Sequence, residues 1–272
     1  MNYLTVGTLW KNENYYALDF IRYHRVVGVE HFIIFNNAVE DDYSLEELLK
    51  NEKDVEVIRF TPTVTQMHQE AWGQLIKYNQ GKTKWLALID ADQCLVPAKI
   101  DDVKEVLKDY EEFACLQINW HSFGSSWQEK RLPGAVYERF LLRGSGDCIY
   151  SAHTQFICQP DRTLPIKTPE PHYCLLPEGE VSVNTNKEKI NENKIVGLNP
   201  GTPLSFNIPP LHDTLWVAHY TNKSKEEWII KNNKGRADIL GEKIPSTQFD
   251  EYENLCNLTT EYRVLELWNK RF

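Results

Sequence analysis

The chain has 272 residues, of which 42% are hydrophobic and 12% aromatic, which is enough for one large domain with a full hydrophobic core or for one domain with a small appendage. Its 30 Lys and Arg residues against 39 Asp and Glu residues leave a net charge of -9, which argues against a general nucleic-acid binder because such a protein needs a basic surface. No segment approaches the roughly 20 apolar residues of a membrane-spanning helix, and no signal peptide is visible at the start of the chain.

The first part of the chain alternates between short apolar runs and segments with helical periodicity. Between Asn14 and Val27, for example, aromatic and aliphatic residues recur at spacings of three and four. Strands that alternate with helices are typical of a parallel sheet, so we predict a Rossmann-like half, although it contains neither G-x-G-x-x-G nor a P-loop sequence. We expect strands over Tyr3–Leu9, His31–Phe35, Val55–Phe60 and Trp85–Ile89, and helices over Asn14–Val27, Leu45–Leu49 and Gln66–Asn79.

Two aspartates, Asp90 and Asp92, follow the fourth predicted strand. Ligands of open α/β sheets bind at the carboxyl ends of the strands, and alternation along an extended chain would point both carboxylates the same way. Both would then face one Mg²⁺ or Mn²⁺ ion, since hard cations prefer carboxylate oxygens and bring substrate phosphates with them. The alternative is an ordinary turn, in which an aspartate caps the next segment.

The second part of the chain has a less regular pattern. Pro133 is expected to begin a helix that runs through Phe140, because proline suits the first position of a helix. Short strands and long loops are expected over residues 144–218. The other elements expected here are helices over Val103–Tyr110, Lys225–Asn232 and Thr260–Phe272, strands over Phe113–Trp120 and Leu215–His219, and an aromatic loop over His121–Trp127.

The six cysteines form no C-x-x-C pair and no zinc-like cluster with histidine. Several lie in apolar contexts, so we expect buried free thiols and a reducing compartment. A cytoplasmic location is therefore predicted, with at most peripheral association at the inner face of the membrane. The basic and aromatic tail Trp268–Phe272 would favour an anionic membrane surface, and a packed C-terminal helix is the alternative.

Five blocks occur in order along nearly the whole chain. They are KNE at Lys11–Glu13, DFIRYHRVVGVEHFIIFNN at Asp19–Asn37, WLALIDADQCLVP at Trp85–Pro97, FGSSW at Phe123–Trp127 and HYTNKSKEEWIIKNNKGRAD at His219–Asp238. Together they resemble glycosyltransferase family 92 and its bacterial family-two-like relatives. The sequence departs from the family pattern at Phe20, where Trp is usual, at Gln93, where an acidic residue is common, and at Gln155, where a basic residue is typical.

The resemblance implies an α/β fold of the GT-A type, with a Rossmann-like nucleotide-binding half, a mixed central sheet and an acceptor-binding half. We expect one domain over residues 1–272, with nucleotide-sugar binding in 1–100, acceptor binding and catalysis in 101–240, and a helical tail in 241–272. The implied activity is sugar transfer from a nucleotide-diphosphate donor, expected to be a UDP-sugar, to a glycan or glycolipid, with inversion and with Mn²⁺ or Mg²⁺ as cofactor. Galactose is a frequent donor sugar in this group.

Three residues are candidates for the metal site. Asp92 is expected to bind the metal directly, which would neutralise the diphosphate leaving group, and Asp90 to bind the ribose or a metal-bound water. The resemblance places a third metal ligand at the end of a late strand, where His219 lies. A neutral imidazole can bind Mn²⁺, and the alternative for His219 is a hydrogen-bonded histidine at a strand end.

Basic residues surround the start of the helix predicted at Lys225. Amide groups at a helix N-terminus favour an anion, and nearby ammonium groups would add to that attraction. A solvated basic turn is the alternative, and Glu226 and Glu227 are interpreted as first-turn capping residues. The candidates for diphosphate contacts are Lys223, Lys225, Lys231 and Arg236.

The end of the first strand, from Thr8 to Glu13, is expected to bind the nucleotide base. Glu13 would accept a hydrogen bond from a uracil imide or, alternatively, form a structural ion pair. Asn36 and Asn37 follow the second strand and would lie at the same crevice, although asparagine is also an ordinary turn residue.

An inverting transfer needs a general base that deprotonates the acceptor hydroxyl. Glu138 is the leading candidate, and a structural ion pair with Arg139 is the alternative; Asp147 and Glu170 are the next candidates. Aromatic residues would serve as an acceptor platform or as core packing; they are Trp120, His121 and Trp127.

Two other function classes compete with sugar transfer. A metal-dependent nucleotidyltransferase also uses paired aspartates, but it usually has a glycine-rich basic loop near its N-terminus, which GTLW at Gly7–Trp10 is not. A non-catalytic nucleotide-sugar-binding protein is the second, and the intact Asp90, Asp92 and His219 argue against it.

Overall fold

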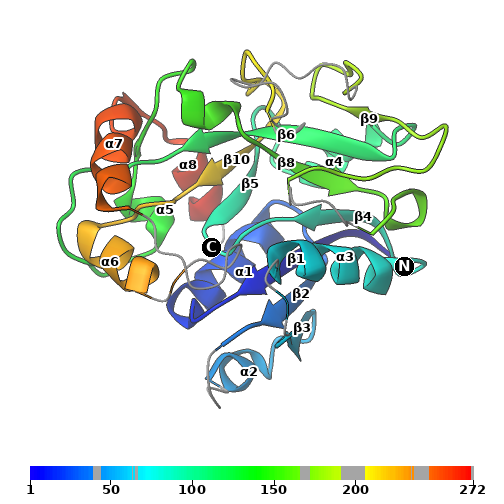
Figure 1. Ribbon diagram of the computed structural model, residues 1–272, viewed down its shortest axis with the longest axis horizontal. Helices are drawn as coiled ribbons and strands as arrows, with labels where there is room; N and C mark the ends of the chain where they lie inside the picture. The colour runs from blue at the N-terminus through cyan, green and yellow to red at the C-terminus, as the bar shows by residue number, and fades with distance from the viewer. Residues whose placement is uncertain are drawn as a thin grey trace.

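The computed structural model describes residues 1–38, 44–62, 64, 67–165, 172–190, 206–233, 235 and 245–270. These residues form a nine-stranded mixed sheet in the order β3-β2-β1-β4-β8-β6-β10-β5, with β9 paired to β6 (Figure 1). A separate two-stranded sheet joins β7 and β11. The strands are β1 (Asn2–Trp10), β2 (His31–Asn36), β3 (Val55–Arg59), β4 (Thr83–Leu88), β5 (Gln93–Pro97), β6 (Cys115–Ser122), β7 (Leu142–Arg143), β8 (Thr154–Cys158), β9 (Ser182–Val183), β10 (Leu215–His219) and β11 (Thr259–Thr260).

The sheet has a parallel part and a mixed part. Strands β3, β2, β1 and β4 are parallel, which confirms the arrangement predicted for the start of the chain. Strand β8 runs antiparallel between β4 and β6, and β5 runs antiparallel beside β10. Trp10 pairs with Asn36, and Gly7 pairs with Leu88, so β1, β2 and β4 all end at one edge of the sheet. Ligand sites in open α/β sheets lie at such an edge.

Both faces of β4 are buried. Trp85 and Ala87 of β4 belong to the larger hydrophobic cluster, and Leu86 and Leu88 belong to a second cluster on the other face. Burial on both faces explains why β4 reads as a continuous apolar run. Residues of α1, α4 and α8 line the first cluster, and residues of α3 line the second. Gly7 allows α3 to pack closely, since a Cβ at this position would lie 3.1 Å from Leu88 and 3.3 Å from Leu75.

The helices agree with the predicted order, with shifted ends. The helix predicted from Asn14 begins as a 3-10 turn, and the helix predicted from Pro133 was placed too early because Gly134 has a φ of 105°, outside the helical region. The predicted helical tail consists of two helices with β11 between them. The helices are α1 (Ala17–Val26), α2 (Ser44–Leu49), α3 (Met67–Asn79), α4 (Val103–Lys108), α5 (Val136–Arg139), α6 (Lys225–Asn233), α7 (Ser246–Cys256) and α8 (Arg263–Asn269), with 3-10 turns η1 (Asn14–Tyr16), η2 (Ile149–Ala152) and η3 (Pro160–Arg162).

Strand β5 is an element that the sequence analysis missed. It begins directly after the two aspartates, where the backbone N–H of Gln93 donates to the carbonyl of Asp90 at 3.0 Å and closes a tight turn. Strand β5 then pairs with β10 rather than with β4, so that His219 lies opposite Gln93. The turn therefore connects strands that lie far apart in the order of the sheet, and a pairing between such distant segments has no local sequence signal.

Three further expectations concern the whole chain. All six cysteines are free and buried, as predicted. None of the helices among the described residues has the length and apolar content needed to cross a bilayer. The sheet is continuous across residue 100, since β4 pairs with β8 and β5 with β10; the functional division into halves stays a prediction.

Candidate active site

The two aspartates lie at the sheet edge where β1, β2 and β4 end. The expectation that an extended chain would align their carboxylates was wrong, because Asp90 and Asp92 occupy a hydrogen-bonded turn. Each side chain consequently has its own set of partners. The two carboxylates nevertheless remain close to each other, and the negative charge of Asp92 is one of the contributions that act to raise the pKa of Asp90.

Asp90 lies in a network of histidine and glutamine side chains. Its Oδ1 is 3.0 Å from His68 Nε2, and its Oδ2 accepts a hydrogen bond from Gln93 Nε2 at 3.1 Å. Gln93 Oε1 in turn accepts from Gln155 Nε2 at 2.8 Å, and Gln155 Oε1 lies 3.0 Å from His172 Nδ1. Burial raises the pKa of Asp90, but the attraction of His68 outweighs it, and the pKa falls below its usual value. Asp90 is therefore ionised at neutral pH.

Asp92 faces cationic and imidazole groups instead. Its Oδ2 is 2.5 Å from Lys231 Nζ, and its Oδ1 is 3.5 Å from His219 Nε2. The side chain is only 8% exposed, so burial opposes its ionisation. Lys231 first, then His219 and Lys223, more than offset this effect and hold the pKa of Asp92 well below its usual value. Asp92 is thus a buried carboxylate that keeps its charge because of its neighbours.

His219 ends β10 and packs edge-on against Trp120, with ring centroids 4.3 Å apart. Its Nε2 faces Asp92, and its buried Nδ1 makes no hydrogen bond with any part of the chain that the structure describes. Ligands of one Mn²⁺ or Mg²⁺ ion lie about 3 Å apart when each bond is about 2.1 Å. Asp92 Oδ1 and His219 Nε2 have comparable spacing at 3.5 Å. An oxygen and nitrogen donor set of this kind suits a divalent cation such as Mn²⁺.

The described residues contain no cluster of three or more His, Cys, Asp or Glu side chains arranged to hold a metal ion. Asp92 and His219 would therefore supply two ligands, and the remaining positions would be left for water and phosphate oxygens, as is usual for Mg²⁺ sites that bind nucleotides. Lys231, which lies 2.5 Å from Asp92, is the cationic group in direct contact with that carboxylate.

The four basic candidates differ in their positions. Lys223 is 4% exposed and lies over the Tyr16 ring, with its Nζ 3.9 Å from Glu13 Oε2. Burial lowers the pKa of Lys223, while Glu13 and Asp92 partly counteract that effect. Lys231 contacts Asp92, as described above. Lys225 is exposed and its Nζ lies 3.7 Å from Glu129 at the surface. Arg236 lies outside the described residues.

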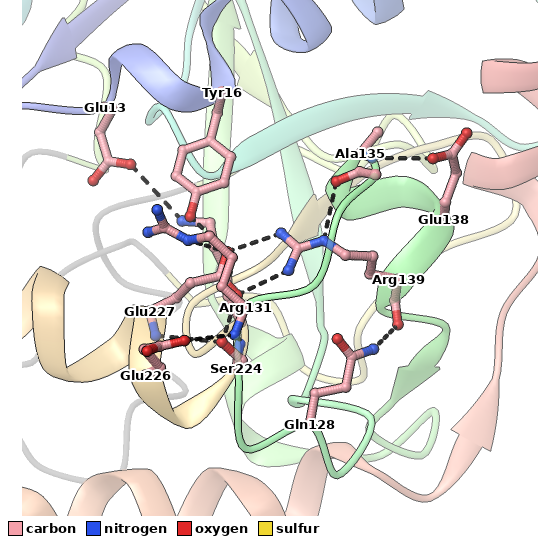
Figure 2. Close-up of polar contacts among 12 residues, drawn as sticks. Glu13, Tyr16, Gln128, Arg131, Ala135, Glu138, Arg139, Ser224, Glu226 and Glu227 are labelled. Carbon is pink, nitrogen blue, oxygen red and sulfur yellow. Dashed lines mark hydrogen bonds and ion pairs between the residues drawn. The ribbon is translucent and has the colours of Figure 1, made fainter.

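A buried glutamate holds the N-terminus of α6 (Figure 2). Glu227 accepts hydrogen bonds from the Ser224 backbone N–H at 3.1 Å and hydroxyl at 2.6 Å, while Ser224 Oγ accepts from the Glu227 N–H at 3.3 Å. This reciprocal capping box confirms the interpretation of Glu227 as a capping residue. Glu227 also accepts from Tyr16 Oη at 2.7 Å and from Arg139. The helix start is therefore tied to η1 and α5.

The predicted base-binding edge contains Thr8, Glu13 and Asn36. Thr8 Oγ1 accepts a hydrogen bond from Trp10 Nε1 at 2.8 Å. Asn36 donates to both carboxylate oxygens of Glu46 at 3.0 and 3.1 Å and accepts from the Ala38 N–H at 3.0 Å. Thr8 and Asn36 are both buried and already have hydrogen-bond partners, whereas Glu13 faces the side chain of Lys223.

Glu138 has structural contacts in α5. Its Oε2 accepts from the Ala135 N–H at 3.0 Å, which caps the helix, and its Oε1 accepts from Trp268 Nε1 at 2.8 Å. The proposed ion pair of Glu138 with Arg139 was wrong, because the Arg139 guanidinium points away from Glu138 and pairs with Glu227 (Figure 2). A catalytic role of Glu138 stays a prediction. Of the other candidates, Asp147 accepts from Ser145 at the exposed surface, and Glu170 lies outside the described residues.

The three residues proposed as an aromatic acceptor platform lie in different surroundings. Trp120 is 6% exposed and is surrounded by His153, His172 and His219. His121 is also buried and stacks on His212 with centroids 3.5 Å apart. These two aromatic residues therefore pack in the interior. Trp127 is 62% exposed.

Several residues of the site were not found in the sequence. His68 lies in the first turn of α3, and since α3 follows β3 it begins at the same edge of the sheet as the aspartates. The place of His68 at the start of a helix that follows a strand could therefore have identified it from the sequence. His172 lies outside the helices and strands, and His153 lies between η2 and β8, so no periodicity marks the direction of either side chain. Tyr16 and Glu227 meet only because η1 and α6 come together in the fold.

The sequence model of glycosyltransferase family 92 matches residues 3–192. The chain belongs to glycosyltransferase family 92. Its mixed α/β sheet agrees with the α/β architecture expected from the sequence blocks. A glycosyltransferase family 92 protein of Ricinus communis is 26% identical over 128 residues, which make up 45% of this chain and 23% of the relative. The match thus spans about a quarter of that relative's length.

Solved structures that match part of the chain have TM-scores below 0.5 and low sequence identity. S. aureus TarS, residues 1–349, crystallised with UDP, has a TM-score of 0.38 and 10% identity over 58% of this family 92 chain and 47% of its own. HddC from Yersinia pseudotuberculosis has a TM-score of 0.38 and 12% identity over 66% of this chain and 88% of its own.

Proposed function

We propose that this family 92 protein transfers a sugar from a UDP-sugar to a glycan or glycolipid acceptor, with inversion and with the help of Mn²⁺ or Mg²⁺. One observation carries the proposal. The buried, ionised carboxylate of Asp92 lies beside His219 and two lysines at the sheet edge where a nucleotide is expected to bind. Family membership supports sugar transfer, and the site chemistry supports a diphosphate donor.

Asp92 and His219 would hold the cation, which when bound would withdraw charge from the diphosphate and improve it as a leaving group. Lys223 and Lys231 would place two ammonium groups near the same phosphates. Lys223 is fixed by burial, by its contact with Tyr16 and by Glu13, so it would meet the diphosphate in a preset position. Such fixed charges act more strongly in a water-poor site than in bulk solvent.

The remaining contacts would orient the nucleotide. Asp90 would bind the ribose or a metal-bound water, and its network through Gln93 and His68 would hold it in place. Glu13, Thr8 and Asn36 lie along the edge proposed for the base. Glu13, whose Oε2 also lies 3.9 Å from Lys223 Nζ, is the residue proposed to accept a hydrogen bond from the uracil imide. Residues 1–100 would in this way provide most donor contacts, with Lys231 supplied by α6 and Lys223 by the residues just before it. Lys225 and Arg236 would add to the positive charge around the phosphates.

Donor binding is the most direct test. Calorimetric titration with UDP, GDP and CDP, each with Mn²⁺, is expected to show clear preference for UDP. Preference for GDP or CDP would reject the uridine assignment and leave the fold assignment intact. A panel of UDP-sugars, including UDP-galactose, would then be screened for hydrolysis and for transfer to glycan and glycolipid acceptors. Binding without turnover on any acceptor would favour a non-catalytic protein.

A further inference from the structure

Lys231 contacts the same carboxylate, Asp92, that the proposed function gives to a divalent cation. Its Nζ lies 2.5 Å from Asp92 Oδ2 and 3.3 Å from the Thr221 carbonyl. The other oxygen of the same carboxylate faces His219 at 3.5 Å. A metal ion bound between Asp92 and His219 would therefore lie within a few ångströms of the Lys231 ammonium group.

Two positive centres at one buried carboxylate repel each other. Asp92 is 8% exposed, so water screens this repulsion poorly. Lys223 adds a second ammonium group, which is buried and helps to lower the pKa of Asp92, while the charge of Lys231 lowers the pKa of Lys223. A divalent cation alone would consequently bind Asp92 more weakly than it would with the Lys231 ammonium group held elsewhere, although Asp90 and Glu13 also place negative charge near Lys231.

Lys231 can leave Asp92 without a movement of its helix. Its side chain is 29% exposed, whereas the first turn of α6 is anchored by the buried Glu227 with its partners Ser224 and Arg139. The lysine stem has four rotatable carbon–carbon bonds, so a change of rotamer moves the ammonium group by several ångströms.

We propose that Lys231 competes with the divalent cation for Asp92, and that the donor diphosphate resolves the competition by taking the Lys231 ammonium group. Lys231 is thereby a positioning residue that couples metal binding to donor binding. This inference rests on the proposed function, because it requires that a metal and a nucleotide diphosphate share the site. The coupling is reciprocal, so UDP must tighten Mn²⁺ binding by the same factor as Mn²⁺ tightens UDP binding.

The experiment measures Mn²⁺ and UDP affinities separately and together in the full chain. Free Mn²⁺ would be followed by electron paramagnetic resonance, and UDP by calorimetry. In Lys231→Met, Mn²⁺ alone is expected to bind about tenfold more tightly than in the wild type, as when one nearby like charge is removed from a partly solvated site. UDP alone is expected to bind more weakly, and the coupling factor to fall towards one.

Two control variants accompany this one. Lys231→Arg keeps the positive charge and should keep the weak binding of Mn²⁺ alone. Lys108→Met removes a charge from an exposed helical pair with Glu105 and should leave both affinities unchanged. Circular dichroism and melting curves would confirm that all three variants are folded.

The outcomes separate this inference from the proposed function. If Lys231→Met binds Mn²⁺ alone no more tightly than the wild type, the competition is overturned, while UDP and Mn²⁺ binding to the wild type would still support the proposed function. If Mn²⁺ fails to bind the wild type even with UDP present, the metal part of the proposed function falls, and the competition falls with it.

Discussion

Arg139 and Glu227 form a bidentate ion pair with N–O distances of 2.8 and 3.0 Å. Their side chains are 4% and 1% exposed, so the pair is sealed from water. It joins α5 to the start of α6, which carries Lys231 and follows Lys223. Through this pair, the position of two proposed diphosphate contacts depends on a helix that lies in another part of the chain.

Glu227→Ala is expected to destabilise the fold strongly. The variant leaves the Arg139 guanidinium buried without its carboxylate and also removes the partner of Ser224 and Tyr16. Breaking a buried ion pair from one side typically lowers the free energy of unfolding by about 3–5 kcal/mol. Urea unfolding would measure the change. Glu129→Ala at the surface is the control, and an effect of Glu227→Ala as small as that of the control would contradict a structural role for the pair.

The same carboxylate predicts an acid-dependent part of the stability. Burial opposes its ionisation, but hydrogen bonds from Arg139, Ser224 and Tyr16 outweigh burial and lower the pKa of Glu227 from 4.5 to about 2. The unfolded state thus takes up the proton first as the pH falls. The resulting stabilisation is fully present above about pH 5 and disappears as the pH falls through 4.5 towards 2. A shift of this size corresponds to about 3 kcal/mol.

This pH dependence is measured as a difference. Unfolding free energies of the wild type and of Glu227→Gln are compared between pH 7 and pH 2.5, so that other carboxylates cancel. The gap between the two proteins should shrink as the solution becomes more acidic. A gap that stays constant over this range would show that Glu227 titrates normally.

Asp92→Ala is expected to abolish transfer while the fold remains intact. The change removes the carboxylate proposed to hold the cation, and loss of electrostatic stabilisation of a leaving group typically lowers turnover by about 10²–10³-fold. Transfer would be assayed with saturating Mn²⁺, and melting temperature would be recorded on the same preparation. Asp109→Ala, at an exposed position, is the control. Near-normal turnover of Asp92→Ala would remove Asp92 from the metal site.

Glu138→Gln separates a structural from a catalytic role. Both carboxylate oxygens accept hydrogen bonds, from Ala135 and Trp268, and an amide can accept at only one of its two polar atoms. We therefore expect the free energy of unfolding to fall by about 1 kcal/mol, with most of the specific activity kept. An equally stable variant whose transfer rate falls by about 10²–10⁴-fold would instead identify Glu138 as the general base.

Much of the fold could be predicted because its signals are local. Apolar runs of the right length located β1, β2, β3 and β4, and alternation with helical segments implied their parallel order. Periodicity works in such cases because burial on one or both faces of an element constrains residues that are neighbours in the chain. The position of Asp90 and Asp92 at the sheet edge follows from the same reasoning, since the carboxyl ends of parallel strands share an edge.

The partners of the polar side chains could not be predicted in this way. Lys231 reaches Asp92 across 139 positions of sequence, and Arg139 meets Glu227 across 88. Such pairs form only where α6 returns to the sheet edge, and a hydrogen bond between distant segments leaves no periodic trace in either one. The sequence therefore identified the carboxylates and the edge on which they lie. Only the tertiary structure decided that Asp90 faces a histidine and a glutamine, while Asp92 faces a lysine.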